Sequence, residues 1–226
     1  MPTPLKKLKL YSTAGGPNPY KVAIILEELG LPYETELLDV TDVKKKPFTD
    51  LNPNGRVPAL TDPNTNDGDG LTLWESGAII QYLVETYDTS GKITYHSSPE
   101  KFLLTQWLHF QVSGQGPYYG QCAWFTHYHH ETLPSAQDRY LREVERVIAV
   151  LDGWLRTHAF LVGDKCTYAD LSFVTWAVLV PWLDKDKKIP MSQYSAYNAW
   201  LEKLVARPAV RGVLDLLEER RKKLLG

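Results

Sequence analysis

The sequence predicts an α+β protein in which a βαβ-ββα domain is followed by an all-α helical bundle domain. Short apolar strands alternate with one-sided apolar helices up to about residue 86, and beyond residue 97 only helical periodicity continues. The length of 226 residues also suits two packed domains. We therefore expect a first domain over 1–86, a linker over 87–97 and a second domain over 98–226.

The first domain opens with a strand over 8–11 and a loop of turn-forming residues. Asn18-Pro19 then predicts a helix start, because Asn is a favoured N-cap and Pro is favoured just after it. Gly30 predicts the end of this helix, and a second strand is expected over 33–38. A βαβ order of this kind implies a parallel strand pair with a right-handed crossover.

A turn at 52–55 and an apolar strand from Arg56 follow. Pro58 within this strand cannot donate to a sheet, which indicates an edge position or a cis Val57-Pro58 bond. A hairpin loop is expected over 64–70.

The returning strand continues directly into Glu75-Ser76 and an apolar helix. This acid-hydroxyl pair therefore lies at a helix N-terminus, where free amides and the helix dipole favour an anion. Taken alone, the pair is also typical of an ordinary helix cap.

In the second domain, Ser98-Pro99 starts a helix that Gly114 to Pro117 are expected to interrupt, and a long helix is expected over 133–155. Thr167 to Asp170 has the form of a capping box. Two further helices are expected, over 194–206 and 209–223.

Composition argues against several classes of partner. A net charge of −2 gives no general attraction to nucleic acid or to an anionic membrane. No apolar run approaches the length of a membrane span, and the basic N-terminus lacks the apolar stretch of a signal peptide. Cys122 and Cys166 are too few for a disulfide framework, which indicates a reducing, cytoplasmic location.

The motifs Val57-Pro58-Ala59-Leu60 and Glu75-Ser76-Gly77-Ala78-Ile79, at this spacing, resemble the glutathione-binding signature of the cytosolic glutathione transferases. That resemblance implies a thioredoxin-like first domain. The segments 17–22 and 114–121 are similar to the nu-class enzymes and their fungal relatives, which include a yeast nitrogen regulator. The capping box of the second domain matches the same family.

The resemblance implies glutathione as co-substrate. Ser76 and the helix amides would bind its γ-glutamyl carboxylate, Glu75 its ammonium group, and the backbone of Val57 its cysteinyl portion. Arg56, or a lysine of the 44–46 run, would neutralise the glycyl carboxylate. The lysine run is equally typical of a solvated face.

The thiol must become a thiolate, and in this branch an Asn at the start of the first helix has that role, which Asn18 matches. A catalytic Cys is excluded because Cys122 is the first in the chain. Ser12, Thr13 and Tyr11 are available by position. Nu-class members often carry a Thr where this chain has Gly16, so a second thiol contact from Ser12, Thr13 or backbone amides stays open.

Arg139 matches a position that reaches the partner's glutathione in nu-class dimers, and the resemblance implies a homodimer. An exposed helix Arg is the alternative interpretation. The aromatic residues at 107 and 118–128 fit either a co-substrate pocket or a core. His127, His129 and His130 lack accompanying ligands other than Glu131, so we predict no metal site.

We therefore predict a glutathione transferase that acts on a small apolar electrophile, with peroxide and disulfide reduction as further options. The alternative is a non-catalytic, transferase-like regulatory or ligand-binding protein. Only MPTPLKK precedes the first expected strand, whereas the nitrogen regulator has a long Asn-rich extension, and this difference favours the enzyme.

Overall fold

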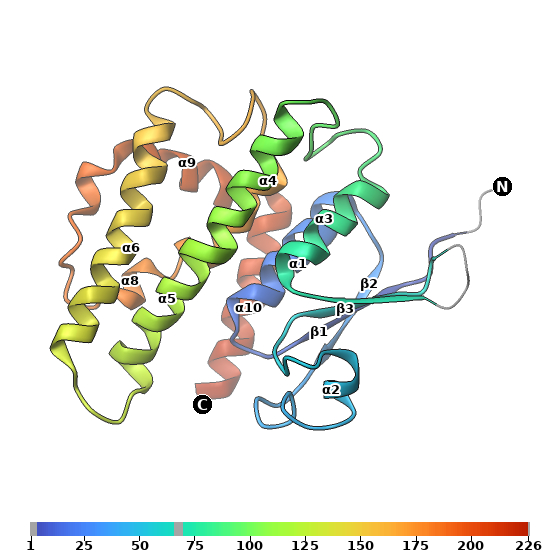
Figure 1. The fold of residues 1–226 in the computed structure, drawn as a ribbon, viewed down its shortest axis with the longest axis horizontal. Helices are drawn as coiled ribbons and strands as arrows, with labels where there is room; N and C mark the ends of the chain where they lie inside the picture. Colours follow the sequence, from blue (N-terminus) through green and yellow to red (C-terminus); the bar gives the residue numbers. More distant parts are fainter. Residues whose placement is uncertain (1–3, 66–69, 226) are drawn as a thin grey trace. The chain divides into compact units, whose positions relative to one another are not determined.

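The computed structural model describes residues 4–65 and 70–225, which fall into two compact units (Figure 1). One unit comprises Met1–Lys92 with Arg207–Gly226, and the other comprises Ile93–Ala206. The expected domain division differs in one respect, because the last helix groups with the first unit. This helix packs on the first helix of the chain and buries Val210, Val213 and Leu217.

The first unit is a four-stranded mixed sheet with helices on both faces (Figure 1). Its elements are β1 (Leu8–Ser12), α1 (Pro17–Leu29), β2 (Tyr33–Leu37), α2 (Phe48–Leu51), β3 (Ala59–Asp62), β4 (Leu71–Trp74), α3 (Ser76–Tyr87) and α10 (Pro208–Leu225). The strand order is β2-β1-β3-β4, with β1 and β2 parallel and the other pairs antiparallel. This confirms the βαβ-ββα order of a thioredoxin-like domain. Part of the expected hairpin loop, 66–69, lies outside the described residues.

Two local predictions in this unit need correction. The helix α1 begins at Pro17 with Gly16 as its N-cap, so Asn18 is inside the first turn and is not the cap. Proline fits the first helical position as well as the position after an Asn cap, which explains the error. Of the two alternatives for Pro58, the cis Val57-Pro58 bond is confirmed and the edge position is wrong. The strand β3 starts only at Ala59 and is a central strand.

The second unit is all helical, as predicted. Its elements are α4 (Glu100–Phe110), the π-helix η1 (Gln111–Gln115), α5 (Gly116–Ala123), the π-helix η2 (Trp124–Tyr128), α6 (Pro134–Leu155), α7 (Tyr168–Ala177), α8 (Val180–Leu183), the short 3₁₀-helix η3 (Met191–Gln193) and α9 (Ser195–Val205). Gly114 lies in the wide turns of η1 and Gly116 begins α5, so the α-helical pattern is interrupted here, as expected, but the chain stays helical.

The capping box at Thr167 and Asp170 is confirmed. Asp170 is fully buried and accepts hydrogen bonds from Leu161 N (2.9 Å), Thr167 N (3.0 Å) and Trp200 Nε1 (2.9 Å). One carboxylate therefore ties the start of α7 to α9 and to the loop before α7. Within 4–65 and 70–225, none of the helices combines the length and the apolar character that crossing a membrane requires.

Candidate functional site

Three segments of the first unit meet at one end of the sheet. Tyr11 in β1 pairs with Ala59 in β3, which in turn pairs with Trp74 in β4. The loop after β1, the turn before β3 and the Glu75-Ser76 helix start all leave the sheet at this end. Because neighbouring strands lie about 4.8 Å apart, the pairing holds the bases of these segments within roughly 10 Å of one another. The segments that carry the residues predicted in the first unit therefore start from the same end of the sheet.

The N-terminus of α1 presents Asn18 with few competing donors. Pro17 and Pro19, on either side of Asn18, have no N–H group. Asn18 is half-buried in the first turn. It therefore combines a side-chain amide with a backbone N–H at the positive end of the helix dipole.

The N-terminus of α3 has a buried hydroxyl and a strained carboxylate residue. Ser76 is the first residue of the helix and is buried, whereas Glu75 is exposed and is the N-cap. Glu75 has φ 69° and ψ 113°, a conformation that costs a non-glycine residue on the order of 1–3 kcal/mol. Such strain is found preferentially at binding sites, where it aims a side chain.

A buried lysine near Glu75 was missed by the sequence reasoning. Lys21 lies one turn after Asn18 on α1 and is only 1% exposed. Burial lowers the pKa of Lys21 from 10.5 to about 7, and the negative charge of Glu75 opposes this shift. The sequence signal that could have indicated its burial is that Lys21 is a single lysine within the apolar stretch that follows Pro19. Lys21 brings a positive charge from α1 toward the start of α3.

The turn before Val57 is built by a second residue that the prediction treated only as a turn former. Asn52 is buried; its Nδ2 donates to Arg56 O (2.6 Å) and its Oδ1 accepts from Asn54 N (2.9 Å). Gly55 has φ 58°, and a Cβ there would lie 2.8 Å from Val43 O, so only glycine fits. This turn fixes the backbone of Val57 and leaves the side chain of Arg56 exposed.

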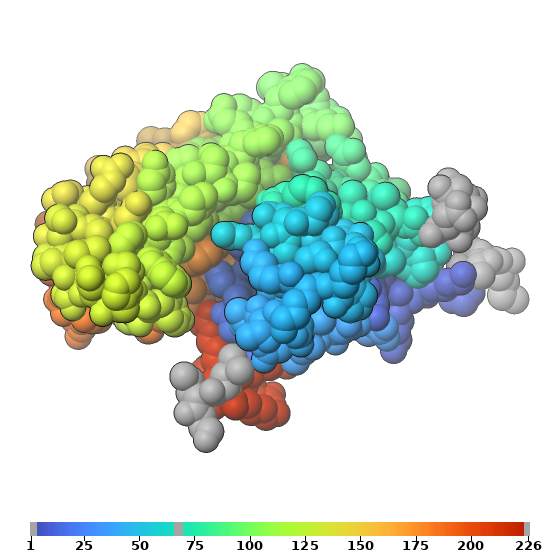
Figure 2. Space-filling model, turned by 60° about the horizontal axis from the view of Figure 1, so that its bottom comes forward, coloured from blue at the N-terminus to red at the C-terminus, as the bar shows by residue number. Residues whose placement is uncertain are grey.

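The lysine run 44–46 lies on an exposed surface, within the sky-blue segment of Figure 2. The ammonium groups of Lys45 and Lys46 pair with Asp42 (3.2 Å) and Asp50 (3.0 Å). Lys44 Nζ donates to Asn54 O (3.1 Å) and so supports the same turn. This arrangement is that of a solvated face.

The end of β1 and the loop after it contain three candidates for a second contact with the thiol, and their surroundings differ. Tyr11 packs against Phe48, with ring centres 5.8 Å apart, so it serves strand packing. Ser12 is 1% exposed and its hydroxyl donates to Thr13 O (3.0 Å). Thr13 Oγ1 lies 3.1 Å from where a Cβ on Gly16 would be. The Thr13 hydroxyl thus lies against Gly16.

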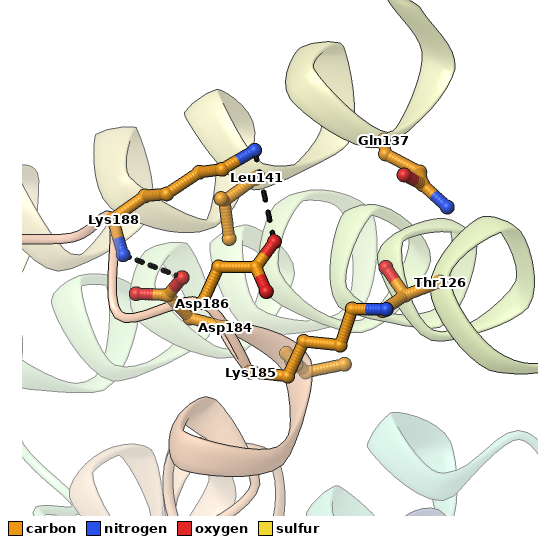
Figure 3. A pocket seen from close by; sticks show the side chains of 8 residues that line it. Thr126, Gln137, Leu141, Asp184, Lys185, Asp186 and Lys188 are labelled. Atoms are coloured by element: carbon orange, nitrogen blue, oxygen red, sulfur yellow. Dashed lines mark hydrogen bonds and ion pairs between the residues drawn. The ribbon is translucent and has the colours of Figure 1, made fainter. Parts of the chain in front are cut away.

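A shallow hollow in the second unit is too small to be a substrate site (Figure 3). Its volume of about 20 Å³ holds roughly one water molecule. It lies beside a loop that Asp184 and Lys188 stabilise: Asp184 accepts from Lys188 N (2.8 Å), and Lys188 Nζ pairs with Asp138 on α6 (3.1 Å).

One group of possible metal ligands occurs among the described residues. His129, His130 and Glu131 have ligand atoms within 4.8 Å of one another. His127 is not part of this group, because its ring stacks on Trp182 (4.0 Å) and its Nε2 contacts Trp182 O (2.9 Å). Three consecutive loop residues, two of them exposed, also form such a group without any ion. The absence of a metal stays a prediction.

Comparison with known sequences decides the family. The family described as "Glutathione S-transferase, N-terminal domain" matches residues 6–85, and "Glutathione S-transferase, C-terminal domain" matches residues 117–208. The chain belongs to the glutathione S-transferase family. The chain is also 47% identical over 211 residues to the glutathione S-transferase-like protein gedE of Aspergillus terreus, which covers 89% of this chain and 92% of gedE.

Solved structures of family members extend the similarity to three dimensions. The glutathione transferase URE2P6 of Phanerochaete chrysosporium, in complex with oxidized glutathione, is 45% identical with a TM-score of 0.88, covering 96% of this chain and 97% of that one. Ure2p5 of the same fungus, cocrystallized with 1-(S-glutathionyl)-2,4-dinitrobenzene, is 38% identical with a TM-score of 0.86 and the same coverage. The fungal branch of the glutathione S-transferase family is therefore the branch to which this chain is similar.

In this glutathione S-transferase family member, Arg139 is the one predicted site residue in the second unit. It is an exposed residue of α6. The aromatic residues divide into two groups: Trp107 and Tyr119 are buried core, whereas Trp124 and Tyr128 are 50% and 64% exposed. The core interpretation is confirmed for Trp107 and Tyr119, and a co-substrate pocket at Trp124 and Tyr128 stays a prediction.

Lys21 should make the stability of the protein depend on pH. The unfolded chain keeps the Lys21 proton up to about pH 10.5, whereas the folded protein keeps it only up to about pH 7. Because the unfolded state binds more protons between these values, the free energy of unfolding rises with pH. From pH 7 to pH 9 we expect a rise of about 2 kcal/mol in wild type relative to Lys21→Met.

Urea denaturation at both pH values measures this difference. Lys203→Met, at an exposed position on α9, is the control and should follow wild type. Parallel stability changes in wild type and Lys21→Met would contradict the prediction.

Proposed function

We propose that this chain is a glutathione transferase that binds glutathione at the β1, β3 and β4 end of the sheet and activates its thiol. The observation that supports this best is the paired row of Tyr11, Ala59 and Trp74, from which the three predicted binding segments extend together. URE2P6 was solved with oxidized glutathione and Ure2p5 with a glutathione conjugate, so relatives of this chain bind glutathione compounds, which supports glutathione as the ligand here. The conjugate also favours the enzyme over a non-catalytic alternative.

Each group of glutathione has a proposed partner. Ser76 and the first amides of α3 bind the γ-glutamyl carboxylate, because they combine a hydroxyl donor with the helix dipole. Glu75 binds the ammonium group next to that carboxylate. The backbone of Val57 pairs with the cysteinyl portion as an added strand would. The exposed Arg56 neutralises the glycyl carboxylate.

The thiol of glutathione is activated by Asn18. A plain cysteine thiol has a pKa of about 8.5, and each unit of lowering needs about 1.4 kcal/mol of preferential stabilisation of the thiolate. The Asn18 side-chain amide and the dipole of α1 both supply it. Thr13 is the better candidate for a second contact, because the Ser12 hydroxyl already donates to Thr13 O.

The activated thiolate would attack an aryl halide, forming a carbon–sulfur bond as the halide leaves. The same thiolate can reduce a hydroperoxide or attack a mixed disulfide. Steady-state assays with all three substrate classes and glutathione, run in parallel, test the function. Turnover in at least one assay supports the enzyme, and none in any assay would favour the regulatory alternative.

Substitutions at the start of α3 test the binding site. Glu75→Gly and Ser76→Ala should each weaken glutathione binding by about 1.5–3 kcal/mol, the usual value for a charge-assisted hydrogen bond. Glycine adopts a positive φ more readily than Glu, so Glu75→Gly relieves backbone strain, but it also removes the negative charge near buried Lys21; urea denaturation of this variant therefore accompanies the affinity measurement.

Isothermal titration calorimetry measures these affinities. Glu85→Gln, an exposed carboxylate on the same helix, should bind as wild type does. Unchanged affinity in both site variants would rule out this assignment.

Asn18 variants test thiol activation. Asn18→Asp places a negative charge against the sulfur and should raise the pKa of the bound thiol, whereas Asn18→Ala removes only the donor. Since Gly16 and not Asn18 is the N-cap, neither variant removes a helix cap. The ultraviolet absorbance of the bound thiolate, titrated against pH, gives the pKa. If the Asn18→Asp protein retains the wild-type pKa and turnover, Thr13 becomes the activating residue.

We also propose that the chain is a cytoplasmic homodimer, with Arg139 reaching toward the partner's glutathione. The exposed position of Arg139 and the exposed Trp124 and Tyr128 support a contact surface on the second unit. Light scattering at micromolar concentration should give twice the mass of 25.7 kDa. A monomeric mass would refute the dimer and the role of Arg139 together.

A further inference from the structure

The loop between β1 and α1 is held by arginines from the far end of the chain. Arg221 on α10 donates to Gly15 O through Nε (3.3 Å) and Nη2 (2.9 Å). Tyr20 OH donates to Ala14 O (3.1 Å), and Arg220 Nη1 donates to Tyr20 OH (3.2 Å) while its guanidinium lies over the ring. Two consecutive loop carbonyls are therefore held by side chains of α1 and α10.

The other end of α10 is fixed to the same helix. Arg207 makes a bidentate contact with Glu28, with Nε and Nη2 at 2.6 and 2.8 Å from the two carboxylate oxygens. Glu28 is 4% exposed, so the contact is sheltered from water. The helix α10 thus runs antiparallel along α1, anchored near Glu28 and in contact with the loop at its far end. Figure 2 shows the red C-terminal segment beside the dark-blue N-terminal one.

The loop needs external support because its own residues supply little. Ala14, Gly15 and Gly16 carry no polar side chain, and two consecutive glycines lose much conformational freedom when ordered. The path of this loop sets how Thr13 and Asn18 approach each other.

Arg220 and Arg221 differ from their neighbours. Lys222 and Lys223 are exposed and pair with Glu218 and Glu219 on the same helix. These lysines lie on the solvated face of the helix end, whereas the two arginines are partly buried.

We propose that Arg220 and Arg221 are positioning residues for thiol activation: Arg221 holds the Gly15 carbonyl, Arg220 supports the Tyr20 hydroxyl that holds the Ala14 carbonyl, and together they keep Thr13 and Asn18 aligned toward the glutathione sulfur. This inference rests on the proposed function. It gives the C-terminal helix a part in catalysis without contact with substrate.

The test compares Arg221→Gln with Lys222→Gln, an adjacent exposed position with the same loss of charge. Hydrogen exchange in the protein without glutathione reads the loop directly, and the 12–20 segment should exchange about tenfold faster in Arg221→Gln only. With glutathione bound, the pKa of the glutathione thiol should rise by about one unit in Arg221→Gln. Turnover should then be about tenfold lower than in wild type below that pKa and equal to wild type above it. KM for glutathione should stay within about twofold, since Glu75 and Ser76 are intact.

Arg221→Lys keeps a hydrogen-bond donor, so its exchange rate and thiolate pKa should lie between those of wild type and Arg221→Gln. It replaces Arg221→Gln in the test if that variant fails to fold. Unchanged exchange in Arg221→Gln or, failing that, in Arg221→Lys would overturn the proposal. Faster exchange with an unchanged thiolate pKa would overturn the positioning role alone and leave the proposed function standing. Wild-type protein that binds no glutathione in calorimetry would refute the proposed function, and this inference with it.

Discussion

The pairing of Tyr11, Ala59 and Trp74 across three strands is the constraint on which the candidate site depends. These residues lie far apart in the sequence, and backbone hydrogen bonds alone bring their neighbours together. Because side chains alternate between the two faces of a strand, a shift of one residue would turn every side chain of that strand to the other face. The register therefore decides which segments meet at the end of the sheet, independently of the contacts that the side chains of the site make.

Helix α1 adds a second constraint, because it is buried almost continuously from Pro19 to Leu26. Two charges lie within this buried helix, and a buried charge is tolerated only with a partner. Glu28 has Arg207, the residue just before α10, and Lys21 interacts with Glu75 at the start of α3. These charges tie α1 to the two helices beside it. The site is thus supported by electrostatic contacts as well as by the sheet.

Local sequence signals were reliable where a few neighbouring residues decide the conformation. Gly30 ends α1 with φ 66°, and Thr167 and Asp170 form the expected capping box. The signals were less reliable where tertiary contacts compete. Gln111 and Gln115 bond to each other and Gln115 to Phe173 O, and these buried contacts support the π-helical turns at glycines that would otherwise end the helix.

By itself the sequence determined the order of strands and helices, the all-helical second part, and the residues Asn18, Val57, Glu75 and Ser76 as candidates. These follow from propensity, capping and motifs, which act over a few positions. Only the tertiary structure decided that Lys21 is buried near Glu75, and that α10 joins the first unit with its arginines on the loop before α1. The contacts from Arg220 and Arg221 join residues 200 and 206 positions apart. Pairing over such a distance depends on how helices pack, and it leaves no periodic pattern in either segment.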